Sequence, residues 1–310
     1  MREIAVFGGG AHPALTAEIC QFLGVPPQPV RTRRFANDCL EVQLEANCRE
    51  RDVFLIQPLV PPVQEHLVEL LLMADAARGA SAARVTAVIP HYAYARSDKK
   101  DKARVSIGGR LVADLLVTAG VGRVLTLTLH SPQVHGFFSV PVDHLHALRE
   151  LTGHFRDRDL SRTVVVSPDL GYVKSAADFA RRLGVPVAAG SKQRISDREV
   201  TISAIIGEVA DRDVIIVDDE IARGTTVFEL MAKLGEYQPR SVAVACTHGV
   251  FADGALDRLT AAEVTEVVCT NSAPVSAGHP KLHVLSVAPA LAEAIHRIHD
   301  GESVSVLFEL

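Results

Sequence analysis

Short hydrophobic runs alternate with longer segments of helical periodicity along most of the chain. The runs are apolar throughout, which is typical of strands in a parallel sheet that helices cover on both faces. Strands are therefore predicted over 53–56, 84–90, 123–129, 163–167, 213–218, 241–246 and 264–269. Between the strands, apolar residues recur with amphipathic spacing, which predicts helices over 63–79, 107–119, 172–183, 225–235 and 288–299. This alternation predicts an α/β fold.

The chain has 310 residues, of which 48% are hydrophobic, and this suffices for two domain cores. Residues 124–130 and 242–248 resemble each other, because each run is an apolar strand that ends in histidine. The likeness indicates an internal duplication; the alternative is the general similarity of buried strands. We expect two domains, 1–145 and 146–295, each a mostly parallel sheet with helices on both faces. The C-terminal segment, 296–310, is expected to return to the first domain and to end in a strand.

Composition excludes two classes of partner. The net charge is −5 and charged residues make up 22% of the chain, so nothing indicates a nucleic-acid or membrane surface. No apolar run approaches the length that spans a bilayer, and the first run, 4–7, is too short for a secretory signal. The five cysteines are scattered without metal-ligand spacing, which is typical of reduced thiols. We therefore expect a cytoplasmic protein.

The most specific motif follows the predicted strand at 213–218. This strand delivers two adjacent carboxylates, Asp218 and Asp219, to its C-terminal end, where ligands of open parallel sheets bind. The loop that follows opens a helix and contains Ala222, Arg223, Gly224, Thr225 and Thr226. Backbone N–H groups at a helix start suit a phosphate dianion, and the carboxylates suit vicinal sugar hydroxyls. A phosphorylated pentose presents both groups, whereas two aspartates that merely cap a helix are the structural alternative.

This motif resembles the phosphoribosyl diphosphate signature of the type I phosphoribosyltransferase fold. Residues 89–100, 129–138 and 166–171 narrow the likeness to the ribose-phosphate diphosphokinase family. Arg34-Phe35 and 290–295 resemble the same family, so the likeness covers nearly the whole chain in order. It implies two tandem phosphoribosyltransferase-like domains, the first on the ATP side and the second on the ribose 5-phosphate side. It also implies a homo-oligomer, either a dimer or a hexamer.

That family transfers the diphosphoryl group of ATP to the C1 hydroxyl of ribose 5-phosphate, which gives AMP and phosphoribosyl diphosphate. By resemblance, His130 and Asp169 are ligands of Mg²⁺. Lys192 and Arg194 match the family's Lys-x-Arg pair, which begins a mobile loop that closes on the transferring phosphates. Two cations there can stabilise charge on phosphoryl oxygens. Without the resemblance, a Lys-x-Arg pair in a polar loop is more often solvated surface.

Nucleotide contacts are expected, by the same resemblance, from Phe35, Asn37, Arg96 and Asp98. Phe35 can stack on adenine. The family's adenine loop reads Phe-x-Asp-Gly-Glu, but residues 35–39 read Phe-Ala-Asn-Asp-Cys, so the glycine and the glutamate are replaced. This departure concerns recognition of the base.

Other ligand loops depart from the family pattern as well. Thr128 stands where the family has an acid two residues before the metal histidine, and Leu170 replaces a histidine after Asp169. The usual Asp-Thr-x-Gly-Thr of the sugar-phosphate loop becomes 222–226, which loses a carboxylate and gains Arg223. The glycine shifts by one place, which concerns the position of positive φ in this loop.

Three functions remain open at this stage. An active diphosphokinase is favoured. A non-catalytic regulatory paralogue is disfavoured because residues of the catalytic and metal sets survive, namely Lys192, Arg194, His130 and Asp169. A related enzyme with a changed nucleotide or sugar phosphate is indicated by Asn37–Cys39 and by Arg223.

Overall fold

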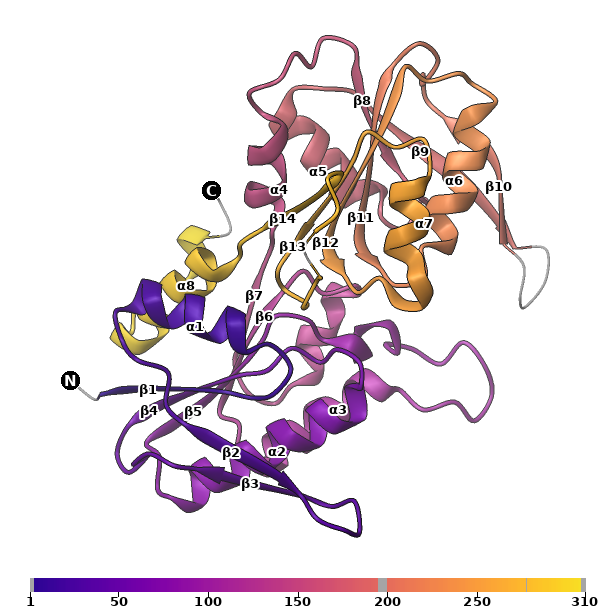
Figure 1. The fold of residues 1–310 in the computed structure, drawn as a ribbon. Helices are drawn as coiled ribbons and strands as arrows, with labels where there is room; N and C mark the ends of the chain where they lie inside the picture. Colours follow the sequence, from indigo (N-terminus) through magenta and orange to yellow (C-terminus); the bar gives the residue numbers. More distant parts are fainter. Residues whose placement is uncertain (1–2, 195–199, 277, 308–310) are drawn as a thin grey trace. The chain divides into compact units, whose positions relative to one another are not determined.

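The computed structural model describes residues 3–194, 200–276 and 278–307 (Figure 1). They form two compact units. The first contains the chain up to His146, the short segment Ser272–Pro274 and the chain from Val287 onward, and the second contains Ala147–Asn271 and Val275–Ser286. The returning segment is longer than the expected 296–310, because the whole C-terminal helix packs within the first unit.

The first unit is built on a five-stranded sheet whose neighbouring strands are all parallel, in the order β1-β4-β5-β6-β7. The strands are β1 (Ile4–Gly8), β4 (Asp52–Ile56), β5 (Arg84–Ile89), β6 (Arg123–Leu127) and β7 (Val142–Leu145). A separate antiparallel hairpin consists of β2 (Val30–Arg34) and β3 (Leu40–Leu44). The helices are α1 (Pro13–Leu23), α2 (Val63–Gly79), α3 (Gly108–Ala119) and α8 (Ala288–Asp300), with 3-10 turns η1 (Ala93–Arg96), η2 (Pro132–Phe137) and η4 (Ser305–Leu307).

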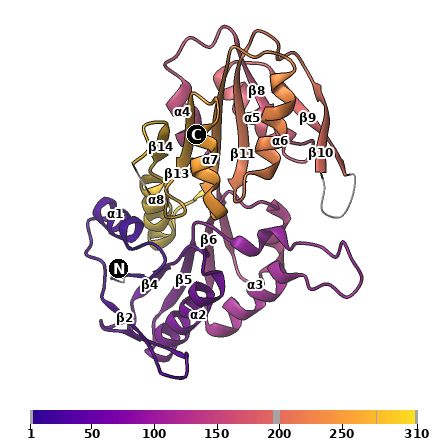
Figure 2. The same ribbon diagram turned by 45° about the vertical axis from the view of Figure 1, so that its right-hand side comes forward.

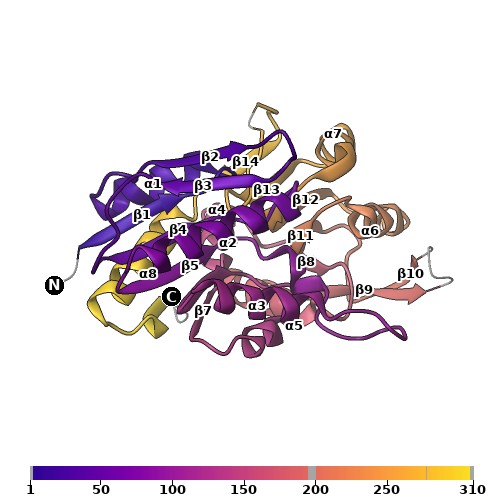
Figure 3. The same cartoon turned by 90° about the horizontal axis from the view of Figure 1, so that it is seen from below.

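Helices cover both faces of this sheet. On one face, Phe7 and Leu55 belong to a buried cluster that includes Leu70 of α2 and Leu116 of α3. On the other face, α1 and α8 lie side by side, one indigo and one yellow in Figures 1 and 3. The two ends of the chain therefore share one layer of the first unit.

The second unit is built on a seven-stranded sheet in the order β10-β9-β8-β11-β12-β13-β14. The pairing of β10 with β9 is antiparallel, and the other neighbours are parallel. The strands are β8 (Thr163–Ser167), β9 (Val187–Arg194), β10 (Val200–Ile206), β11 (Asp213–Ile221), β12 (Ser241–Gly249), β13 (Glu266–Thr270) and β14 (Leu282–Leu285). The helices are α4 (Leu148–Phe155), α5 (Val173–Leu183), α6 (Thr225–Gly235) and α7 (Ala255–Ala261), with the 3-10 turn η3 (Ala252–Gly254).

Two cores lie on the two faces of the second sheet. Phe155 of α4 and Phe179 of α5 pack with Val165 in one core, while helices α6 and α7 cover the other core, as Figure 2 shows. Val164 and Val166 belong to that other core, so consecutive residues of β8 alternate between the two. This is why the strand reads as an uninterrupted apolar run in the sequence.

The predicted α/β class and the parallel sheets are confirmed, and each strand and helix predicted before residue 300 has a counterpart in the structure. One extent and one element were wrong. The strand predicted over 213–218 continues to Ile221. The last strand, expected over 303–308, is replaced over Ser305–Leu307 by a 3-10 turn, which the Leu307 N–H closes by donating to the carbonyl of Val304. Among the described residues, no helix combines the length and the apolar composition that a membrane span requires.

Candidate active site

The candidate site of the second unit lies where its parallel strands end. Strands β8 and β11 are neighbours, so the residues that follow β8 lie at the same edge of the sheet as the end of β11. Asp169 follows β8, and Asp218 and Asp219 lie near the C-terminal end of β11. Asp219 is 3% exposed and Asp218 is partly exposed. The structure thus brings together three carboxylates that the sequence had singled out.

Burial and like charge both disfavour ionised carboxylates where these strands end. Burial raises the pKa of Asp218 well above its usual range, and the charges of Asp219 and Asp169 raise it further. A backbone N–H of Asp219 donates to Asp218 Oδ1 at 2.9 Å, and this hydrogen bond opposes the shift without cancelling it. Burial, followed by the charges of Asp219 and Asp218, raises the pKa of the Tyr172 phenol well above its usual value. The edge therefore favours hydroxyl donors or a cation.

Asp169 is held in place by the backbone that follows it. Its Oδ1 accepts hydrogen bonds from the N–H groups of Gly171 and Tyr172, at 2.9 and 3.1 Å. Its carbonyl accepts a further hydrogen bond from Ser167 Oγ at 2.7 Å. These contacts make a tight turn before α5 and fix the carboxylate at the sheet edge. Leu170, which replaces the family's histidine, is exposed.

The predicted phosphate loop, 222–226, connects β11 to α6. Gly224 precedes the helix with φ +73°, the left-handed region, so the shifted glycine is the residue that takes positive φ. A Cβ at this position would lie 2.9 Å from Phe228 Cε2, which also excludes larger residues. Thr225 and Thr226 begin α6, where the first backbone N–H groups have no partner within the helix. Such a helix start suits an anion.

Arg223, the residue gained in this loop, has an ion-pair partner. Its Nε lies 2.7 Å from Asp253 Oδ2 in the turn η3, and both side chains are largely exposed. Its carbonyl accepts a hydrogen bond from Arg258 Nη2 at 2.8 Å, and the Arg258 guanidinium stacks over the Phe228 ring. Arg258 thereby supports the loop from the helix α7. This positioning contact had no signature in the sequence.

Lys192 and Arg194 were expected in a polar loop, and this placement was wrong for the backbone. Both residues belong to strand β9, where Lys192 pairs with Ile202 and Arg194 with Val200 of β10. Their side chains, and residues 195–199, lie outside the part of the chain that the structure describes. The pair stands at the end of an antiparallel hairpin that extends the second sheet.

In the first unit, His130 follows strand β6 and is exposed. The two residues before it make the connection: Thr128 N–H donates to the carbonyl of Leu145, and Leu129 N–H donates to His144 Nε2, both at 2.8 Å. Thr128 has φ +42°, an uncommon conformation for a β-branched residue. Thr128, which stands in place of the family's acid, therefore sits at a strained point of the connection.

Asp98 ties the predicted nucleotide segment to the same connection. Its Oδ2 accepts a hydrogen bond from Gln133 Nε2 at 2.6 Å, and Lys99 lies 3.4 Å from Oδ1. Burial opposes ionisation of Asp98, but a hydrogen bond from Ser131 and the charge of Lys99 hold its pKa below the usual value. Arg96 lies two residues earlier, at the end of η1, and is exposed. Gln133 and Ser131 were not singled out from the sequence.

Phe35 and Asn37 lie at the tip of the β2–β3 hairpin. Asp38 N–H donates to the carbonyl of Phe35, and Phe35 N–H donates to the carbonyl of Cys39, both at 2.9 Å. Asp38 takes the left-handed conformation, φ +71°, at the place of the family's glycine. Phe35 is 40% exposed, and the Arg33 guanidinium lies 5.3 Å from the centroid of its ring. The ring is therefore available for stacking.

Comparisons with known proteins agree with these features. A sequence profile for the N-terminal domain of ribose phosphate pyrophosphokinase matches residues 4–120, and one for the phosphoribosyl synthetase-associated domain matches residues 193–309. A Streptomyces coelicolor protein, provisionally named ribose-phosphate pyrophosphokinase, is 69% identical over 100% of this chain and 98% of its own length. The ribose-phosphate pyrophosphokinase of Deinococcus radiodurans is 49% identical over 98% of each chain.

A solved structure gives the same result. The crystal structure of phosphoribosylpyrophosphate synthetase from Mycobacterium smegmatis matches with a TM-score of 0.91 and 38% sequence identity. The match covers 97% of this chain and 100% of that one. The likeness in sequence and the likeness in fold therefore point to one family.

Proposed function

Because the chain belongs to the ribose-phosphate pyrophosphokinase family and is a transferase of that kind, we propose the following reaction for it. The β,γ-diphosphoryl group of ATP passes to the C1 hydroxyl of ribose 5-phosphate, and AMP and phosphoribosyl diphosphate are released. The observation that carries this proposal is the sheet edge of the second unit, where Asp218 and Asp219 directly precede the loop 222–226. The aspartates suit the hydroxyls of a phosphorylated pentose, and the loop suits its phosphate.

The sugar phosphate binds by two kinds of contact in this proposal. Asp218 and Asp219 accept hydrogen bonds from vicinal hydroxyls of the ribose, which offsets the burial and the repulsion that raise the pKa of Asp218. Backbone N–H groups at the start of α6 and the hydroxyls of Thr225 and Thr226 hold the 5-phosphate. Arg223 can add a bidentate contact, because its present ion pair with Asp253 is exposed and therefore weak.

Mg²⁺ fits the residues that would hold it. Asp169 and Asp218 follow or end neighbouring parallel strands of the second unit, so their carboxylates gather where a cation is favoured, and carboxylate oxygens are the donors that Mg²⁺ prefers. Asp169 would supply such a donor, and His130 an imidazole. When bound, the ion neutralises phosphate oxygens and orients them. Asp169 needs no rearrangement for this role, since the N–H groups of Gly171 and Tyr172 already fix its carboxylate.

ATP is held, in this proposal, by residues of the first unit. Phe35 stacks on the base, and Asn37 contributes at the same hairpin tip. Arg96 contacts phosphate oxygens, while Asp98, fixed by Gln133 and Ser131, orients the segment that carries Arg96. Lys192 and Arg194 stabilise charge on the transferring group. The homo-oligomer and the cytoplasmic location expected from the sequence stay predictions.

The proposal is tested by following AMP release from ATP, Mg²⁺ and ribose 5-phosphate. If Lys192 and Arg194 act in the transition state, Lys192→Ala and Arg194→Ala each lower kcat on the order of a hundredfold, with little change in KM. Arg162→Ala is the matched control, because Arg162 is an exposed arginine that pairs with Asp211. Both residues lie just before strands of the same sheet, β8 and β11, at their N-terminal ends. It should keep wild-type turnover.

Three other outcomes would contradict the proposal in different ways. No AMP release from the wild type would indicate a regulatory paralogue. Release of a nucleoside monophosphate only with another triphosphate or another pentose phosphate would indicate a changed substrate. Variants that turn over at the wild-type rate would remove Lys192 and Arg194 from the mechanism.

The double variant Asp218→Asn, Asp219→Asn tests the sugar-phosphate site separately. Calorimetry should detect no binding of ribose 5-phosphate to this variant while its chain remains folded.

A further inference from the structure

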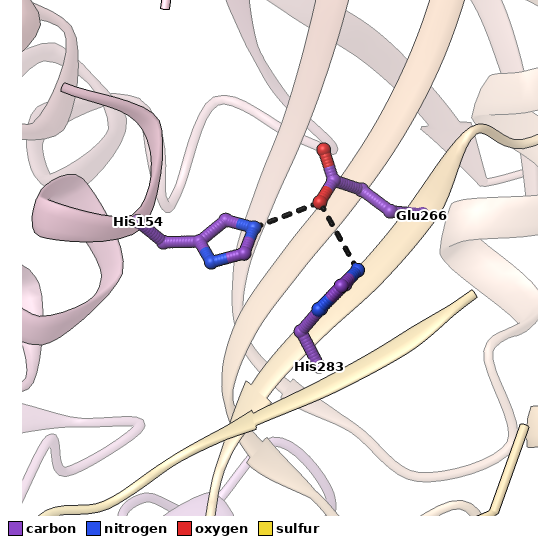
Figure 4. A group of neighbouring side chains, drawn as sticks. All are labelled: His154, Glu266 and His283. Carbon is purple, nitrogen blue, oxygen red and sulfur yellow. Dashed lines mark hydrogen bonds and ion pairs between the residues drawn. The ribbon is translucent and has the colours of Figure 1, made fainter. Parts of the chain in front are cut away.

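A second group of potential ligands lies within the second unit, away from the three aspartates of the candidate site. His154 near the end of α4, Glu266 at the start of β13 and His283 in β14 point toward one another (Figure 4). His154 Nε2 lies 2.8 Å from Glu266 Oε2, and His283 Nε2 lies 3.6 Å from the same oxygen. The three ligand atoms all lie within 4.8 Å of one another.

The group lies at the N-terminal ends of the parallel strands, whereas Asp169 and Asp218 lie at their C-terminal ends. Glu266 is the first residue of β13, and it lines a pocket of about 230 Å³ together with Thr163, Asp213 and Ser241, which begin their own strands. The carboxyl ends of those strands carry the candidate active site. Whatever binds at Glu266 therefore has no part in the proposed transfer reaction.

Arg158 lies between these side chains, and His154 cannot satisfy both Arg158 and Glu266 with one nitrogen. Its guanidinium forms a bidentate ion pair with Glu266, and its Nη2 lies 2.7 Å from His154 Nε2. If His154 Nε2 accepts from Arg158, its lone pair faces the Glu266 carboxylate, 2.8 Å away. If His154 Nε2 is protonated and donates to Glu266, its proton faces the Arg158 N–H. One nitrogen cannot satisfy both partners.

A divalent metal ion in place of the guanidinium removes this conflict, because both imidazole nitrogens and the carboxylate oxygen can then act as electron-pair donors. In a tetrahedral zinc site, ligand atoms about 2.0–2.1 Å from the metal lie roughly 3.3 Å apart. The observed separations of 2.8 and 3.6 Å bracket that value. Two imidazoles and one carboxylate suit Zn²⁺ and similar ions, whereas Mg²⁺ prefers oxygen ligands.

The burial of the group also suits a metal. The side chains of Glu266 and His154 are 9% and 15% exposed, while those of Arg158 and His283 are 43% and 45% exposed. The carboxylate is thus nearly buried, and the guanidinium and one imidazole have free space on the solvent side. Arg158 can therefore swing outward into solvent, where its guanidinium gives up its place over the Phe155 ring, 4.8 Å from the ring centroid.

We propose that His154, Glu266 and His283 form a binding site for a divalent transition-metal ion of the zinc class, which displaces the Arg158 guanidinium. The ion links α4 to the last two strands of the sheet, β13 and the edge strand β14. Its role is structural, since it ties an edge strand to the layer beneath. The guanidinium competes for the same place, so the site responds to the available metal concentration.

The test uses the full chain, stripped of metal and kept in millimolar Mg²⁺ so that oxygen-rich sites are filled. Zn²⁺ is titrated by calorimetry, and Co²⁺ is titrated by its visible absorption. We expect one site per chain, whose affinity falls tenfold or more in His283→Ala and in Glu266→Gln. His279→Ala is the matched control, because His279 is an exposed histidine four residues before His283. It should bind like the wild type.

Two further measurements separate this site from a plain ion-pair network. Arg158→Gln removes the competing cation, so it should bind Zn²⁺ more tightly than the wild type. Zn²⁺ should also raise the midpoint of thermal unfolding of the wild type but not of His283→Ala, since a ligand that binds only the folded state stabilises it. Circular dichroism verifies that each variant is folded. Equal Zn²⁺ binding by the wild type and folded His283→Ala, or none by the wild type, would overturn the proposal.

Discussion

Two ligand loops, one in each unit, reach the same backbone conformation with different residues. Asp38 in the hairpin tip has φ +71°, and Gly224 before α6 has φ +73°. Glycine enters this left-handed region without a steric cost, whereas an L residue does so at about 1 kcal/mol. A Cβ on Gly224 would lie 2.9 Å from Phe228, while the side chain of Asp38 is 83% exposed and pairs with Arg34.

The comparison shows what decides the residue at such a position. Glycine is required where packing leaves no room for a Cβ, and aspartate is tolerated where the side chain extends into solvent. The replacement of the family's glycine by Asp38 therefore preserves the turn. What changes is the chemistry that the hairpin tip presents, because Asn37, Asp38 and Cys39 offer a different set of polar groups.

The strongest way to break the comparison is Gly224→Ala. The left-handed strain and the overlap with Phe228 together should lower the free energy of unfolding by about 2–4 kcal/mol. Binding of ribose 5-phosphate should weaken as the loop shifts. Gly254→Ala is the control, because Gly254 has φ +70° with nothing within 4 Å of its Cβ position. Denaturant unfolding should give it only the strain, about 1 kcal/mol; equal losses would contradict the role of packing.

A second prediction concerns Asp218, which precedes the same loop. The pKa of Asp218 is raised in the folded chain, so between the unfolded pKa, about 3.9, and the folded pKa the folded state binds more protons. Stability therefore falls as pH rises through that window. Asp218→Asn should stabilise the fold at pH 7 on the order of 1 kcal/mol, and this gain should vanish below about pH 3.

Unfolding curves at several pH values test this prediction. Asp211→Asn is the control, because Asp211 is an exposed partner of Arg162 and belongs to a weak surface pair. It should change stability little at any pH. A loss of stability in Asp218→Asn at pH 7 would mean that the carboxylate is held by favourable contacts, contrary to the repulsion described above.

The smallest expected effect sharpens the comparison from the other side. Asp38→Gly relieves the left-handed strain but frees the unfolded chain, so a net gain of about 0.5 kcal/mol is expected. Asp38→Val places a β-branched residue there and should cost about 1 kcal/mol or more. Ala36→Gly, outside the left-handed position, should destabilise slightly. If Asp38→Gly and Ala36→Gly change the unfolding midpoint alike, the strain at Asp38 is negligible.

The sequence predicts best what depends on local pattern. Strands such as β8 lie between two cores, so their apolar runs are visible without any knowledge of tertiary structure. Asp218 and Asp219 follow such a run, and parallel topology alone places them at the sheet edge with Asp169. The fold class and the neighbourhood of these carboxylates were therefore within reach of the sequence.

Features that depend on partners distant in the chain were not predictable in this way. The strand conformation of Lys192 and Arg194 comes from pairing with β10, while the local sequence reads as a polar loop. Arg258 supports Arg223 from a helix 35 residues later. More than a hundred residues separate His154 from His283, with Glu266 between them, so no local motif predicts that the three lie together. The positive φ of Thr128 is equally invisible, because β-branched residues seldom adopt it.

The pairing of α1 with α8 has a consequence for how the protein is made. A ribosome that has released residues 1–146 has supplied every strand of the first sheet, but one helix of its outer layer is still unsynthesised. At about 5–20 residues per second, the chain up to α8 follows on the order of 10 s later. During that interval the apolar face beside α1 remains open to water. The outer layer of the first unit is thus completed only when the last helix of the chain emerges.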